Sequence, residues 1–279
     1  MKSIAVLLTV YNRCKETQKC LTQLYNTSLP PNYNICVYIT DDGCTDGTTE
    51  MITKLYPSVN IIKGNGNLFW NRGMYTAWEK AASNNHDFYL WLNDDTFLYP
   101  DSIYNAIKES EKNKNKAIIV GATIAHDHSQ ITYGGRQPNG KIAVPEGKSI
   151  EVSFFNGNFV LIPQYVYRKI GNLDYTFHHS KGDFDYGMRA IKKGIKIFQL
   201  GKIIGECNLH DQLDGWCNPN NPLKKRLKLL KKPNGMPPYE TFYFESKHYN
   251  TIIAIFHYCT IYLRCFFPKL WILFKKTYE

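Results

Sequence analysis

Two adjacent carboxylates, Asp94 and Asp95, stand at the end of an apolar run and are the first residues that suggest chemistry. The run Tyr89-Leu90-Trp91-Leu92 reads as a buried strand, and Asn93 separates it from the acids. In open α/β sheets, functional groups collect at the carboxyl ends of strands. Carboxylate oxygens are the ligands that hard divalent cations prefer. The residues therefore indicate a metal site; a simple polar turn is the alternative, because Asn and Asp are ordinary turn residues.

A second acidic turn, Asp41-Asp42-Gly43, follows the apolar run of residues 35–40. Asp42 could accept a hydrogen bond from a nucleobase N–H group, with Thr9 close by at the end of an earlier apolar run. A plain turn is again the alternative. No G-x-G-x-x-G segment follows the first run, which argues against a dinucleotide-binding dehydrogenase.

The two acidic turns can act together only if the fold brings them close to each other. The pattern of the first half of the chain predicts such a fold. Apolar runs predict strands, and periodic segments between them predict helices. The strands are expected at 4–10, 35–40, 59–63, 87–93 and 117–124, with helices at about 15–25, 72–83 and 100–112. This alternation favours an α/β fold with an open, mostly parallel sheet and flanking helices. Right-handed crossovers then place Thr9, Asp42, Trp70 and Asp94 along one edge of the sheet.

The second half of the chain is less regular. It predicts a hairpin over 132–145, strands at 159–162 and 195–200, and a helix from Asp183 to Lys193 that Gly194 ends. A polar segment, 207–216, carries His210, and a basic segment follows at 224–232. We therefore divide the chain into a catalytic domain, residues 1–220, and a basic, amphipathic helical tail, residues 221–279.

Composition is that of a globular protein, with 43% hydrophobic and 21% charged residues. The formal charge of +10 is concentrated in residues 221–279, which hold eleven Lys or Arg and three Asp or Glu. That excess predicts an acidic partner for the tail, and we expect an anionic membrane surface and no nucleic acid. No C-x-x-C pair marks a zinc site. The first ten residues lack a signal-peptide cleavage site, so we expect a cytoplasmic protein with reduced thiols.

Four segments together resemble a known family. They are residues 8–13 (Leu-Thr-Val-Tyr-Asn-Arg), 41–48 (Asp-Asp-Gly-Cys-Thr-Asp-Gly-Thr), 93–95 (Asn-Asp-Asp) and 182–185 (Gly-Asp-Phe-Asp) before Arg189. In this order and spacing they look like the inverting family-2 glycosyltransferases, whose fold is called GT-A. The loop 64–70 resembles the bacterial branch that transfers rhamnose, galactofuranose and related sugars. The resemblance covers about residues 1–215.

The resemblance implies a glycosyltransferase that moves a sugar from a nucleotide-diphosphate donor to a hydroxyl of a glycan or lipid-linked acceptor, with inversion. It implies a divalent metal, Mn²⁺ or Mg²⁺, and a part in surface polysaccharide synthesis. The resemblance assigns Asp183 as the catalytic base, Asp95 and His210 as metal ligands, and Thr9 and Asp42 to the nucleobase; a surface histidine in a polar loop is the alternative for His210. We also predict Asn12, Trp70, Arg72 and Asp94 for the donor, with ordinary core as the alternative for Trp70. Asn156, Asn158 and Asp185 are predicted for the acceptor, with an edge strand as the alternative for the segment 154–158.

Two positions depart from the family pattern. Asn93 replaces the first acid of the metal motif, which leaves one negative charge fewer, and Gly182 replaces the Glu that usually precedes the base. Asp183 and Asp185 are two residues apart and would point about 200° apart on a helix, so both do not face one site. Apart from the resemblance, two acids in the first turn would simply stabilise the helix.

Alternatives remain both for the role of the tail and for the activity of the protein. Residues 251–274 are apolar but interrupted by His257, Arg264, Pro268 and Lys269, so no uncharged 18-residue span exists. Peripheral attachment at the inner face of the cell membrane fits this pattern, as does a helical cap or a homodimer interface. A sugar nucleotidyltransferase would need a Gly-rich basic loop after the first strand, which residues 11–14 do not provide. A non-catalytic carbohydrate-binding protein would not need Asp95 and Asp183.

Overall fold

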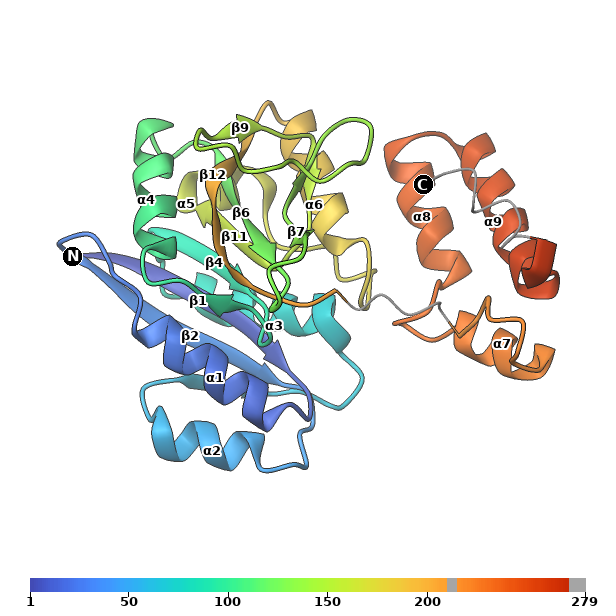
Figure 1. Ribbon diagram of the computed structural model, residues 1–279, viewed down its shortest axis with the longest axis horizontal. Helices are drawn as coiled ribbons and strands as arrows, with labels where there is room; N and C mark the ends of the chain where they lie inside the picture. The colour runs from blue at the N-terminus through green and yellow to red at the C-terminus, as the bar shows by residue number, and fades with distance from the viewer. Residues whose placement is uncertain (210–214, 271–279) are drawn as a thin grey trace. The chain divides into compact units, whose positions relative to one another are not determined.

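The computed structural model of the protein describes residues 1–209 and 215–270. The chain forms two compact units (Figure 1). The first contains residues 1–175 and 182–209. The second contains residues 176–181 and the chain after Leu209, described from Gly215 to Leu270.

The first unit is a mixed α/β domain. Its strands are β1 (Lys2–Val10), β2 (Tyr33–Asp41), β3 (Asn60–Lys63), β4 (Phe88–Leu92), β5 (Phe97–Leu98), β6 (Ile118–Ile124), β7 (Ile131–Tyr133), β8 (Gly135–Arg136), β9 (Ile150–Glu151), β10 (Phe154–Phe155), β11 (Phe159–Pro163) and β12 (Ile197–Glu206). Its helices are α1 (Cys14–Tyr25), α2 (Thr48–Leu55), α3 (Phe69–Ala82), α4 (Ser102–Lys112), α5 (Gln164–Ile170) and α6 (Gly182–Lys192).

The central sheet has the order β3-β2-β1-β4-β11-β6-β12-β5. Strand β1 pairs in parallel with β2 on one side and β4 on the other, and β12 pairs in parallel with β6. Strand β11 is antiparallel to both of its neighbours. The parallel pairing aligns the ends of β1, β2 and β4, so the segments after Val10, Asp41 and Leu92 lie along one edge, as predicted.

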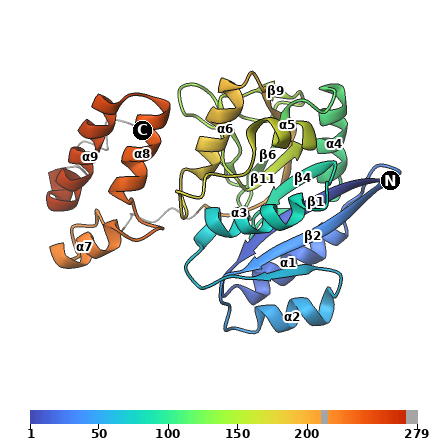
Figure 2. The same ribbon diagram turned by 180° about the vertical axis from the view of Figure 1, so that it is seen from behind.

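Both faces of the sheet are covered by helices, and β1 shows why its sequence is continuously apolar. Ile4, Val6 and Leu8 belong to a core shared with α1, α2 and α4. Ala5 and Leu7, which point the other way, belong to a second core shared with α3, α5 and α6. Figures 1 and 2 show the two helical layers from opposite sides. The predicted α/β fold with flanking helices is confirmed.

The second half of the domain departs from the prediction in detail. Strand β12 continues past residue 200 to Glu206, because Gly205 and Glu206 pair with the short strand β5. The segment 132–145 is not one long hairpin: β7 pairs with β6, β8 pairs with β10, and a single bridge joins Arg136 to Ile142. Helix α5, which starts directly after Pro163, was not predicted.

The second unit is helical, as expected of the tail. It contains α7 (Leu223–Leu230), α8 (Pro238–His248) and α9 (Thr251–Phe266). A small apolar core joins α7 and α9 through Trp216, Cys217, Leu230, Ile261 and Cys265. Within residues 1–209 and 215–270, no helix is long and apolar enough to cross a membrane.

Candidate active site

The acidic turn with Asp94 and Asp95 follows strand β4, and Arg13, which follows strand β1, is paired with both carboxylates. Arg13 Nη1 lies 3.3 Å from Asp94 Oδ1 and 2.6 Å from Asp95 Oδ2. Asp94 is 6% exposed, and Thr17 on α1 donates a hydrogen bond of 3.3 Å to its second oxygen. The parallel pairing of β1 and β4 is what brings Arg13 to these carboxylates.

Burial is the main influence on the ionisation of Asp94. It raises the pKa of this carboxyl to about 7; the negative charge of Asp95 raises the pKa further, and the positive charge of Arg13 lowers it. Two carboxylates side by side disfavour each other's ionisation, so a cation between them is stabilising. In this structure Arg13 supplies that positive charge.

The oxygens of Asp94 and Asp95 fit a divalent cation by their chemistry. Mg²⁺ is commonly held by one or two carboxylates together with substrate phosphates, and Arg13 shows that this oxygen pair already attracts a cation. Within the described ranges, no three His, Cys, Asp or Glu side chains form a metal cluster; the predicted ligand His210 lies outside the described residues. Cys207 Sγ lies 3.7 Å from Asp95, and burial raises the pKa of this thiol to about 12.

Asn93, which replaces the first acid of the family's metal motif, is hydrogen-bonded to Trp70. The indole N–H of Trp70 donates a hydrogen bond of 2.7 Å to Asn93 Oδ1. The Trp70 ring also packs edge-on against Trp91 of β4, with ring centroids 6.0 Å apart. An amide at this position accepts the indole hydrogen without adding a third negative charge beside Asp94 and Asp95.

Asp183 lies in the first turn of α6, half-buried. Its carboxylate accepts hydrogen bonds from the backbone N–H groups of Gly157 (3.1 Å) and Phe184 (2.9 Å). Burial raises the pKa of Asp183 to about 6, and these two N–H groups partly oppose the rise. The carboxyl is thus held in one orientation with a pKa close to neutral.

Gly157 connects Asp183 to the acidic turn. A Cβ atom on Gly157 would lie 2.5 Å from the Trp70 ring and 3.5 Å from the Asp183 Cβ, so only a glycine fits between the two side chains. Trp70 in turn binds Asn93. Through Gly157 and Trp70, Asp183 is therefore linked to the strand end that carries Asn93, Asp94 and Asp95.

The second departure, Gly182, is explained by its neighbour. A Cβ on Gly182 would lie only 1.7 Å from Asn71 Oδ1, and the amide nitrogen of Asn71 is held by the Asp174 carbonyl at 2.9 Å. The space that a Glu side chain would enter is therefore filled by Asn71. Neither this amide nor Arg13 was selected from the sequence, although both directly adjoin residues that were.

Asp185 is not brought to the site. Its carboxylate is fully buried and pairs with Arg189 Nε at 2.8 Å. Arg189 also donates to the carbonyls of Ile170 and Asn172, which ties α6 to the end of α5. This geometry gives Asp185 a structural place in the domain and no exposed oxygen for an acceptor.

Asp42 is 4% exposed, and its carboxylate holds the loop that precedes α3 by hydrogen bonds. Its oxygens accept hydrogen bonds from the N–H groups of Gly66, Leu68 and Phe69, each at 2.9 Å. A Cβ on Gly64 would lie 2.8 Å from Asp42 Oδ1, so this loop position also requires glycine. A nucleobase contact would have to share these oxygens with three amide donors.

The other predicted contacts lie nearby with partners of their own. Thr9 packs closely on Gly73 of α3, and Asn12 accepts a hydrogen bond of 2.7 Å from the Thr45 N–H. Arg72 donates to the Tyr175 carbonyl at 2.9 Å. The two predicted acceptor amides are also engaged: Asn156 accepts from Arg136 Nε at 3.1 Å, and Asn158 donates to Cys207 Sγ at 3.5 Å.

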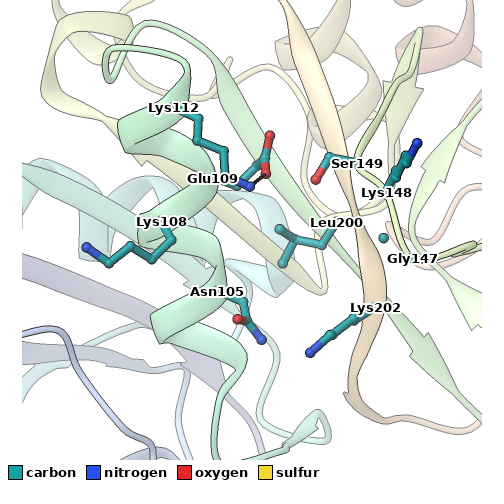
Figure 3. Close-up of a pocket in the computed structure, with 10 residues that line it drawn as sticks. Asn105, Lys108, Glu109, Lys112, Gly147, Lys148, Ser149, Leu200 and Lys202 are labelled. Atoms are coloured by element: carbon teal, nitrogen blue, oxygen red, sulfur yellow. Dashed lines mark hydrogen bonds and ion pairs between the residues drawn. The ribbon is translucent and has the colours of Figure 1, made fainter.

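A separate hollow of about 340 Å³ lies between α4 and β12 (Figure 3). Its charged lining residues are Lys108, Glu109, Lys112, Lys148 and Lys202. None of the predicted site residues lines it. Lys112 pairs with Glu109 at 3.1 Å, so part of the positive charge is neutralised within the hollow itself.

Comparison with known proteins identifies the class. Residues 5–171 match the model of glycosyl transferase family 2, and the chain belongs to this family. Its α/β architecture is that of the GT-A glycosyltransferases. The mannosyltransferase PcManGT from Pyrobaculum calidifontis, solved in complex with GDP-Man and Mn²⁺, superposes with a TM-score of 0.56 over 85% of this chain and 71% of that one, at 14% identity.

Two relatives are similar in sequence. The chain is 30% identical to the chondroitin synthase of Pasteurella multocida over 142 residues, which are 48% of this chain and 14% of that protein. It is 24% identical over 220 residues to a dolichyl N-acetyl-α-D-glucosaminyl phosphate 3-β-D-2,3-diacetamido-2,3-dideoxy-β-D-glucuronosyltransferase of Methanococcus voltae, covering 73% of this chain and 66% of that one. The chain thus spans a small part of the first relative and about two thirds of the second.

Proposed function

We propose that this protein transfers a sugar from a nucleoside-diphosphate donor to a hydroxyl of a glycan or lipid-linked acceptor, with inversion, in surface polysaccharide synthesis. The observation that carries the proposal is the Asp183 carboxylate, oriented by Gly157 beside Trp70 and connected through it to the Asn93–Asp95 turn. Membership of family 2 and the names of the two relatives support the reaction class.

Asp183 is the proposed base. A pKa of about 6 leaves the carboxyl mostly ionised at neutral pH and still able to accept a proton. Gly157 and Phe184 fix its orientation, so the remaining lone pairs can face the hydroxyl of the acceptor. Deprotonation of that hydroxyl as it attacks the anomeric carbon from the side opposite the leaving diphosphate inverts the centre in one displacement.

A Mn²⁺ or Mg²⁺ ion is proposed at Asp95, with His210 as a further ligand. When bound, it would stabilise the negative charge of the leaving diphosphate as a Lewis acid. Asp94, which is paired with the same Arg13 as Asp95, would offer the ion a second carboxylate. The Mn²⁺ ion in the complex of PcManGT supports the choice of metal.

The donor is proposed to lie against Thr9, Asn12, Trp70, Arg72 and Asp94. Asp42 contributes by folding the loop 64–69, to whose N–H groups its carboxylate is bonded. That loop carries the resemblance to rhamnosyl- and galactofuranosyltransferases, and we propose a donor sugar of that group. Asn156 and Asn158 are proposed to face the acceptor.

A thermal-shift series with UDP-, GDP- and dTDP-sugars, each with and without Mn²⁺, tests the proposal. One nucleotide sugar should raise Tm more with Mn²⁺ than without it, and the same compound should be consumed when an acceptor is added. If no nucleotide sugar gives a metal-dependent shift, the proposed donor and metal are wrong.

A further inference from the structure

Helix α9 carries apolar side chains on two opposite sides. One side, with Ala254, Ile261 and Cys265, is buried in the second unit. The opposite side is exposed and we call it the α9 outer face; its residues are Ile252, Ile255, Phe256, Cys259, Leu263 and Phe266.

The α9 outer face is a continuous stripe. Positions 252, 256, 259, 263 and 266 recur at spacings of four and three residues, which places them on one side of a helix. Ile252 is 80% exposed, Phe256 63% and Leu263 55%. Single exposed apolar residues are ordinary, but a contiguous apolar stripe on a soluble unit marks an interaction surface. Helices that are apolar all round are normally covered on all sides.

The same unit is strongly basic. Residues 176–181 and 210–279, which make up this unit, hold twelve Lys or Arg and five Asp or Glu. Five lysines of α7 and the segment after it are exposed: Lys224, Lys225, Lys228, Lys231 and Lys232. Two of these acids, Glu240 and Glu245, lie 2.7 Å from ring nitrogens of His178 and His257.

Arg226 fixes the basic helix to the apolar one. Its guanidinium donates hydrogen bonds to the carbonyls of Cys265 (2.8 Å) and Phe266 (3.5 Å) at the carboxyl end of α9. Leu230 of α7 packs with Ile261 and Cys265 in the core of this unit. The lysines and the outer face therefore belong to one folded piece.

We propose that the second unit binds an anionic lipid bilayer, with the α9 outer face lying in the interface and the lysines of α7 held near the lipid phosphates. An interfacial helix combines bulky apolar side chains with nearby Lys residues in this way, and each lysine adds attraction to an anionic leaflet. A second copy of this chain fits the face less well, because pairing two such units would bring two lysine-rich helices together.

Flotation of the full chain with lipid vesicles tests the proposal. The protein is expected to float with vesicles of phosphatidylcholine that contain phosphatidylglycerol, and much less with phosphatidylcholine alone. Phe256→Ser with Leu263→Ser should lower the partition coefficient about tenfold or more, since two large apolar side chains no longer enter the interface. Replacing Lys224, Lys225 and Lys228 with Gln should cost about fivefold per lysine at low salt.

The matched control is Leu55→Ser with Val144→Ser, two residues of the first unit that are 48% and 55% exposed; this variant should float like the wild type. Light scattering in the absence of lipid gives the second readout, with a monomer expected for every variant. Wild-type protein that does not float, or outer-face variants that float equally well, would overturn the proposal. A dimer that Phe256→Ser and Leu263→Ser dissociate would also overturn it, because the face would then belong to a second copy.

Discussion

Arg13 Nη1 lies 2.6 Å from Asp95 Oδ2, so the proposed metal ligand is already paired with a cation of the chain itself. The same guanidinium is 3.3 Å from Asp94. Its side chain is 40% exposed, which leaves it room to move. A divalent ion at Asp95 would therefore compete with Arg13, and the displaced guanidinium would be free to pair with a diphosphate.

Arg13→Gln is accordingly expected to raise the affinity for Mn²⁺ in the absence of donor. The gain should be about fivefold, because a partly exposed ion pair contributes roughly 1 kcal/mol. Donor affinity in the presence of Mn²⁺ should fall, since the guanidinium no longer meets the diphosphate. Titration calorimetry with Mn²⁺ alone measures the first effect. The control, Arg168→Gln, removes an exposed positive charge from α5 and should leave Mn²⁺ affinity unchanged; equal affinity in wild type and Arg13→Gln would disprove the competition.

Asp183→Asn is expected to keep donor binding and to lower transfer by about 10²–10⁴-fold, the usual contribution of a positioned base. An amide still accepts the Gly157 N–H bond, so the turn should keep its shape. Thermal shift measures donor binding, and release of the nucleoside diphosphate measures transfer. Transfer close to that of the wild type would remove Asp183 from the role of base.

Asp185→Asn provides the contrast two residues away. This change removes the buried negative charge opposite Arg189, although an amide oxygen can still accept its hydrogen bond, and we expect a loss of about 3 kcal/mol in the free energy of unfolding. In a domain of this size, Tm should fall by roughly 6–12 °C. Transfer per folded molecule should fall much less than in Asp183→Asn. The opposite result, a stable variant without activity, would place Asp185 at the acceptor after all.

The contrast between these two acids shows what sequence could predict. Their spacing establishes that they point in different directions. The choice between them depends on Gly157, which is 26 residues from Asp183 in sequence, and on the pairing of Arg189 with Asp185 one helical turn away. The position of Thr9 and Asp94 at the same edge of the sheet was predictable, because each residue lies at the end of an apolar run in a β-α-β pattern. The direction of β11 was not, since a fully buried strand reads the same whether it runs parallel or antiparallel to its neighbours.

The sequence also could not predict why Asn stands at position 93 and Gly at position 182. Each residue is explained by one side chain, Trp70 for Asn93 and Asn71 for Gly182. Both partners lie on α3, and the sequence alone indicates neither contact. Patterns of apolar residues define elements and their edges, whereas such pairings depend on how individual side chains pack between them.

The pH dependence of transfer should follow Asp183. The base acts in its ionised form, so with a pKa of about 6 the rate should rise with pH through 6 and level off above 7. At pH 5 roughly a tenth of the maximal rate should remain. A profile of transfer against pH at saturating donor and metal measures this, and a midpoint near 4 would show that burial does not perturb the base.

The same pKa has the opposite consequence for stability. The folded-state pKa of Asp183 is raised from the ordinary 3.8 to about 6, so the folded protein binds the proton more tightly than the unfolded chain. The resulting stabilisation is complete below pH 3.8 and is lost as pH rises through 6. Asp183→Asn should therefore be more stable than the wild type at pH 8, by on the order of 1 kcal/mol for a half-buried group. The difference should vanish near pH 4, and thermal melts at both values decide it.

The contact between Gly182 and Asn71 gives the last prediction. Gly182→Ala should cost about 1–3 kcal/mol, because its new methyl group would overlap the Asn71 amide oxygen, 1.7 Å away. Asn71→Ala alone should cost about 1 kcal/mol through the lost bond to the Asp174 carbonyl. In the double variant the overlap is gone, so the two effects should fall short of their sum by more than about 0.5 kcal/mol in urea unfolding. Strictly additive losses would mean that Asn71 is not what keeps position 182 a glycine.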